Sequence, residues 1–141
     1  MKNLFTLRNC IQIIAITLIF TSCDPLLLPS DANLTGTWKC SEQHEVDGNS
    51  YYDVEIETDN MDSTTIYIYN FLNLEQNTSV PRYITAHVNG NSISIPNQSI
   101  AGHTVEGSGN LSSDYKTIYL DFTDDIYGND PMQVTATLSK Y

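Results

Sequence analysis

The stretch RYITAHVNGNSISI, residues 82–95, decides the fold of this chain. Every second residue on either side of Asn89-Gly90 is apolar, namely Ile84, Ala86, Val88, Ile93 and Ile95. Strict alternation of this kind is the pattern of a strand with one buried face. Asn-Gly favours a tight turn because both central positions of a type I′ turn need positive φ. The stretch therefore predicts a hairpin of two strands, residues 82–88 and 92–95.

The same period-two pattern recurs along the chain, and no segment of the sequence shows a sustained helical period. Turn residues separate the runs. The pattern predicts about eight antiparallel strands, drawn from residues 37–43, 52–58, 64–72, 82–88, 92–95, 99–105, 107–112, 115–123 and 131–138. Gly107 and Gly109 indicate a bulge or a close approach between strands.

The predicted strands have one apolar and one polar face, which fits a sheet that is buried on one side. A meander of about eight strands removes its exposed edges by closing on itself. We therefore predict an all-β fold, an antiparallel meander closed into a roughly eight-stranded barrel over residues 34–141, with a two-sheet β-sandwich as the alternative. The inward residues are mid-sized aliphatics, which predicts a small cavity or none.

The N-terminus has the layout of a secretory signal peptide. Lys2 and Arg8 precede an apolar run at residues 11–20, which is half the length of about 20 residues that a membrane-spanning helix needs. Thr21-Ser22-Cys23 resembles the bacterial lipobox. The resemblance implies a signal peptide at residues 1–22, cleavage before Cys23, and fatty acyl chains such as palmitate on its thiol. An ordinary signal peptide with an incidental cysteine is the alternative.

Residues 23–33 read as the lipidated cysteine and a tether, because two prolines there oppose regular structure. Cleavage leaves four basic residues against all 17 acidic ones, a net charge of −13. That charge argues against nucleic acid and against electrostatic adhesion to anionic lipid. We expect a monomer in the cell envelope, held at the outer membrane by lipid alone. Whether it faces the periplasm or the cell surface stays open.

Two further resemblances concern the domain itself. Gly36-Thr37-Trp38 is similar to the Gly-x-Trp that opens lipocalins and related calycins, which implies a barrel with Trp38 closing one end. Residues 68–74, 86–98 and 105–109 resemble a recurrent domain of small Bacteroidota lipoproteins. The function of that family is undefined, so this resemblance implies fold and location only.

The candidate ligand-contacting residues are Trp38, Tyr67 and Tyr69. Alternation places Tyr67 and Tyr69 on one face with Phe71, opposite the aliphatic face, where exposed aromatic rings can stack on sugars or partners. Packing under the loop that follows is the favoured alternative. Cys40 is the one cysteine left for the domain, and we expect it to be a buried apolar residue.

Asp124, Asp125 and Asp130 form a candidate calcium site, since hard cations take oxygen ligands from acidic loops. Their spacing does not match an EF-hand, so an ordinary acidic loop is favoured. The three histidines lack zinc-ligand spacing, and no nucleophile elbow, P-loop or dinucleotide motif is present in the sequence. We predict no metal, no cofactor and no enzymatic activity.

The sequence thus favours a non-catalytic cell-envelope lipoprotein whose lipocalin-like domain binds a small hydrophobic ligand. The alternative is a structural or interaction lipoprotein with a filled barrel, which contacts another envelope protein or a glycan.

Overall fold

The computed structural model describes residues 33–45, 48–74, 82–126, 128 and 131–141. Cys23, the signal peptide, almost all of the tether and Asp130 lie outside the described residues. The described chain forms one short 3-10 helix, η1 (Phe71–Asn73), and eight strands: β1 (Gly36–His44), β2 (Gly48–Thr58), β3 (Thr65–Tyr69), β4 (Tyr83–Asn89), β5 (Ser92–Ile100), β6 (His103–Leu111), β7 (Thr117–Ile126) and β8 (Met132–Lys140).

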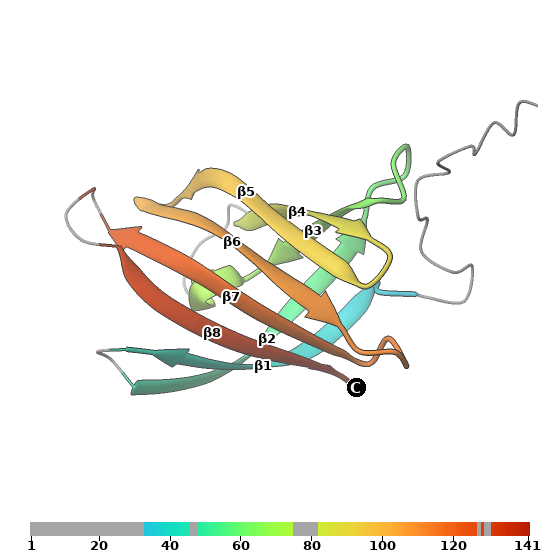
Figure 1. Ribbon diagram of the computed structural model, residues 1–141, viewed down its shortest axis with the longest axis horizontal. Coiled ribbons are helices and arrows are strands. Elements are labelled where there is room, and N and C mark those ends of the chain that lie inside the picture. Colours follow the sequence, from blue (N-terminus) through green and yellow to red (C-terminus); the bar gives the residue numbers. More distant parts are fainter. Residues whose placement is uncertain (1–32, 46–47, 75–81, 127, 129–130) are drawn as a thin grey trace, which may run out of the picture.

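Each strand pairs antiparallel with the next one along the chain, and β8 pairs with β1 to close a barrel (Figure 1). The closing pair runs from Trp38 opposite Lys140 to His44 opposite Val134. Closure removes the free edges that a strand meander would otherwise expose. The predicted all-β meander barrel is confirmed, and the two-sheet sandwich is excluded.

The hairpin in residues 82–95 is present, but its turn lies one residue later than predicted. Asn89 pairs with Ser92, so Gly90 and Asn91 are the central residues, and of these two only Gly90 has positive φ, 58°. That arrangement is typical of a type II′ turn, which places glycine first. The reason is register: the pairing sets Val88 opposite Ile93, with both side chains buried, and a turn centred on Asn89-Gly90 would break that match.

The predicted boundaries between residues 92 and 112 were wrong. β5 continues through Pro96 to Ile100, and a turn at Ala101-Gly102 leads into β6. The register shifts between Ile95 and Gln98, so the bulge lies on β5. Gly107 sits opposite Ile95 in regular pairing, and a Cβ there would lie 2.6 Å from Phe122 Cα. The close approach between strands is confirmed, whereas the bulge belongs to the neighbouring strand.

β3 ends at Tyr69, before the predicted limit at residue 72. Asn70 has φ 57°, a left-handed conformation that asparagine tolerates, and it turns the chain into η1. Phe71 is therefore buried, with its ring centroid 4.9 Å from that of Phe122. The predicted outer row of Tyr67, Tyr69 and Phe71 is thus wrong for Phe71, which faces the core.

Among the described residues, 22 apolar side chains are buried, and they form one contiguous core that includes Cys40, Trp38 and Phe122. Against this background, Glu42, Thr65 and Asp124 are the buried polar or charged residues in the described part of the chain. Glu42 and Asp124 both lie toward the end of the barrel where β1 and β7 finish, so the buried carboxylates are concentrated at that end. No helix within the described ranges is long and apolar enough to cross a membrane.

Candidate functional site

The end of the barrel around Trp38, which we call the Trp38 end, is closed by apolar packing. Trp38 has no exposed surface, and its indole Nε1 donates a hydrogen bond of 2.8 Å to the carbonyl of Leu34. Leu34 is itself buried, and Lys140 Nζ lies 5.5 Å from the Trp38 ring centroid. Trp38 therefore seals this end from solvent and leaves no opening for a ligand beside its ring.

The opposite end, where β1 finishes at His44, has a polar inner wall; we call it the His44 end. Glu42 is only 2% exposed. Its Oε2 accepts a hydrogen bond from the Tyr52 hydroxyl, and its Oε1 accepts one from His44 Nε2. The two partners come from neighbouring strands, because Tyr52 on β2 pairs with Cys40 on β1. A buried carboxylate is tolerated where it is satisfied in this way.

His44 leaves one polar atom without a partner. Its ring Nδ1 is buried and has no hydrogen-bond partner among the described residues. Because Nε2 donates to Glu42, Nδ1 is a lone-pair acceptor in the neutral ring and a donor in the protonated ring. An unsatisfied buried polar atom costs about 1–3 kcal/mol, so it is a natural place for a ligand atom.

Cys40 and Tyr52 stay protonated at neutral pH. Burial, reinforced by the nearby Glu42, raises the pKa of the Cys40 thiol to about 12. Burial also raises the pKa of the Tyr52 hydroxyl, with further contributions from Cys40 and Glu42. Tyr52 is therefore a fixed hydrogen-bond donor. Cys40 is a buried thiol, as predicted, and it carries no thiolate that could act as a nucleophile.

A second polar pair, His103 and Asp124, lies at the same end, where β6 begins and β7 finishes. His103 Nδ1 is 2.9 Å from both carboxylate oxygens of Asp124, which is 1% exposed. Asp124 thus faces inward and is engaged by a histidine. Asp125 follows it on the same strand, and adjacent side chains of a strand point to opposite faces. The described part of the chain holds no group of three or more potential metal ligands.

Apolar side chains accompany these polar groups. Leu72 and Leu74, in and after η1, are half-buried and pack against the core, as does Tyr52. η1 lies at the end of the barrel where β1 finishes and where the β5–β6 turn lies (Figure 1). An apolar wall with a few convergent polar groups is the usual lining of a small-molecule site.

Tyr67 and Tyr69 lie on the outer surface of the barrel, on the face opposite the buried Ile66 and Ile68. Each ring is close to that of Tyr83, with centroids 5.2 Å and 5.0 Å apart. The Tyr67 hydroxyl donates to Asp59 Oδ2 at 2.6 Å, and the Tyr69 hydroxyl donates to a glutamate on β2. The aromatic cluster is therefore a surface feature held by local hydrogen bonds.

The sequence prediction missed Glu42, His44, Tyr52 and His103. A signal for the first two was present, since Glu42 and His44 continue the inward alternation of Trp38 and Cys40. A charged residue at an inward position is unusual and indicates a candidate functional site.

The sequence matches no known family model and no curated protein. Solved structures share its fold. One is described as EF1p2_mFAP2b bound to DFHBI, with a TM-score of 0.56 and 16% identity, over 77% of this chain and 94% of the other. Another is a redesigned beta barrel, b11L5F_LGL, with a TM-score of 0.51 and 18% identity, over 77% and 91%. At these identities the likeness concerns the fold alone, and it agrees with a lipocalin-like barrel.

Proposed function

We propose that this chain is a lipid-anchored, non-catalytic protein of the cell envelope that binds a small, mainly hydrophobic ligand at the His44 end of its barrel. The observation that carries the proposal is the buried Glu42–Tyr52–His44 network, which leaves His44 Nδ1 without a partner among the described residues. A barrel of this fold also holds a ligand in the structure of EF1p2_mFAP2b bound to DFHBI.

The packed core limits how deep the ligand reaches. Ile56, Ile84 and Leu120 are among the fully buried side chains that fill the interior of the barrel. We therefore place the ligand in the last layer of the barrel only, against the Glu42–Tyr52–His44 network. Such a ligand is short, with an apolar body and one hydroxyl or carboxyl group to meet His44 Nδ1.

Native mass spectrometry of the chain purified from its own host tests this proposal. We expect a bound small molecule that is retained by His87→Ala and lost by His44→Ala. His87 is a matched control because it is an exposed histidine on the outer face of β4. Decanol and decanoic acid, added to the ligand-free chain, should bind with at least tenfold lower affinity to His44→Ala than to His87→Ala. No adduct and no decanol or decanoate binding in the unmutated chain would overturn the proposal.

The anchor has its own test. Several acyl chains on Cys23 would hold the domain stably at a membrane, since each buried methylene contributes about 0.8 kcal/mol. Labelled palmitate should enter the exported chain and should not enter a Cys23→Ser variant. An unacylated mature N-terminus would remove the lipid anchor and leave the barrel a free envelope protein.

The alternative function is an interaction lipoprotein whose barrel holds no ligand. The contiguous apolar core favours it, because a filled barrel needs no further occupant. Consistent absence of an adduct in the mass spectra, together with a specific crosslinked partner in cells, would decide for this alternative.

A further inference from the structure

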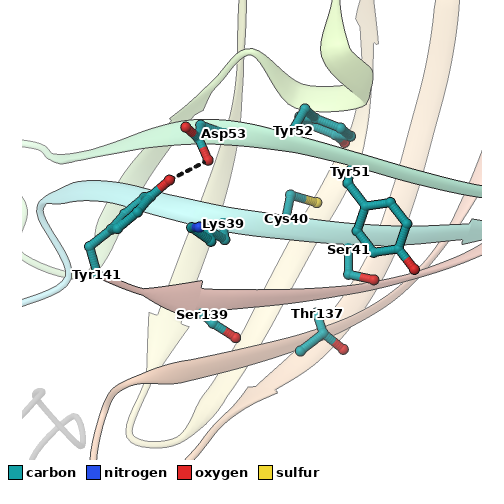
Figure 2. A pocket seen from close by; sticks show the side chains of 9 residues that line it. All are labelled: Lys39, Cys40, Ser41, Tyr51, Tyr52, Asp53, Thr137, Ser139 and Tyr141. Atoms are coloured by element: carbon teal, nitrogen blue, oxygen red, sulfur yellow. Dashed lines mark hydrogen bonds between the residues drawn. The ribbon is translucent and has the colours of Figure 1, made fainter.

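A hollow of about 590 Å³ lies on the outside of the barrel, over β1, β2 and β8. Figure 2 shows it with Tyr51 at one side and Tyr141 at the other. Between them stand side chains from alternate, outward positions of the three strands. Cys40 and Tyr52, which border the hollow through the same strands, belong to the core on the other side of the sheet. The hollow is therefore separate from the His44 end.

Two exposed aromatic rings flank this hollow. Tyr51 is 74% exposed and Tyr141 is 70% exposed. The Tyr141 hydroxyl donates a hydrogen bond of 2.8 Å to Asp53 Oδ1, and Lys39 Nζ lies 4.8 Å from its ring centroid (Figure 2). The Tyr141 ring is thus held in place while most of its surface stays open. A ring fixed in advance loses little conformational freedom when a ligand stacks on it.

The floor between the rings is polar and ordered by strand register. Ser41 on β1 pairs with Tyr51 on one side and with Thr137 on the other. In the next outward row, Lys39 pairs with Asp53 and with Ser139. Neighbouring strands lie about 4.8 Å apart and successive outward residues about 7 Å apart. The hydroxyl, amino and carboxylate groups therefore form a grid whose spacing suits the hydroxyls of a sugar ring.

We infer that this outer hollow binds a neutral oligosaccharide, with sugar rings stacked on Tyr51 and Tyr141 and their hydroxyls bonded to the grid between them. A pyranose offers an apolar C–H face to an aromatic ring and a rim of hydroxyls to polar side chains. The single lysine and single aspartate of the hollow balance each other, so it offers no net charge to an ionic ligand. A stable protein partner would need a contact of about 800 Å² on this surface, which is far more than the hollow between the two tyrosines offers.

Isothermal titration of the chain purified from its own host, in detergent, with maltohexaose, cellohexaose and mannohexaose tests this inference. We expect one of these sugars to bind, and Tyr51→Ala and Tyr141→Ala each to weaken that binding at least tenfold. Tyr141→Phe keeps the ring and should weaken it only a few-fold. Tyr83→Ala is the matched control, because Tyr83 is an exposed tyrosine on the outer face of β4, and it should change binding less than twofold.

The inference is overturned if none of the three sugars binds at millimolar concentration, or if Tyr83→Ala weakens binding as much as Tyr51→Ala does. Circular dichroism of each variant shows whether the barrel is intact. His44→Ala should leave sugar binding unchanged, so this result stands or falls independently of the ligand proposed for the His44 end.

Discussion

The two ends of the barrel are lined by side chains of opposite character, apolar at the Trp38 end and polar at the His44 end. At the Trp38 end, a large ring with no exposed surface satisfies its one polar atom on a nearby carbonyl. At the His44 end, two buried carboxylates, two histidines and a phenol share the wall, and one ring nitrogen has no partner among the described residues. Burying polar groups costs free energy, and a fold built only for stability would have used aliphatic residues at both ends. The contrast assigns stability to the first end, and it is the basis of our proposal that a ligand binds at the second.

The largest loss of unfolding free energy should come from a substitution at the Trp38 end. Trp38→Ala removes a fully buried ring and its bond to Leu34, and we expect a loss of about 3–5 kcal/mol in the free energy of unfolding, measured by urea denaturation. Tyr119→Ala, on the exposed outer face of β7, should cost no more than about 0.5 kcal/mol. A loss below about 1 kcal/mol for Trp38→Ala would mean that this end does not carry the stability we assign to it.

The second-largest loss of stability should come from the side of the barrel between the two ends, where β6 pairs with β7. A Cβ at Gly109 would collide with the backbone carbonyl oxygen of Tyr119 and lie 2.6 Å from Leu120 Cδ2. Backbone cannot move aside cheaply, so Gly109→Ala should cost about 1–3 kcal/mol in the same urea experiment. Ser108→Ala changes the adjacent outward residue and should be nearly neutral. Equal stability of the two variants would contradict the close approach of β6 and β7.

Substitutions at the His44 end should lower stability by removing a hydrogen bond rather than by removing packed volume. Tyr52→Phe removes the donor to the buried Glu42 carboxylate, and we expect a loss of about 1–3 kcal/mol in unfolding free energy. Tyr69→Phe is the control, because its hydroxyl also donates to a glutamate but in an exposed position, and its loss should be smaller. If the two phenylalanine variants were equally stable, the buried network would make no measurable contribution to the free energy of unfolding.

The smallest effect is a pH dependence of stability that comes from Cys40, in the core beside Trp38. The pKa of Cys40 is raised from 9.0 to about 12 in the folded chain, so the unfolded chain releases this proton first as pH rises. The resulting stability is complete below pH 9 and is lost as pH rises from 9 toward 12. Between pH 9 and 10 the thiol should account for about 1 kcal/mol of lost stability. Cys40→Ala should show a correspondingly shallower decline, whereas Trp38→Phe should keep the slope of the unmutated chain.

The strands could be predicted because their signal is local. Alternation in residues 82–95 or 131–138 reports which side chains face inward, whatever the partner strand is. The turn at Gly90-Asn91 could not be placed in the same way, because the pairing of Val88 with Ile93 overrides the local preference of Asn89-Gly90. Ala101-Gly102 was missed for a related reason: Ala101 has φ 53°, a conformation that alanine rarely adopts and that only the paired strands on either side impose.

The sequence by itself determined an all-β chain of about eight strands, since alternation and turn chemistry act between near neighbours. It also determined that Cys40 belongs to the core. Only the tertiary structure decided that β1 closes on β8, that Phe71 turns inward, and that Glu42, Tyr52 and His44 share one network. These are contacts between strands, and their geometry depends on the register in which the barrel closes, which no single stretch of sequence encodes.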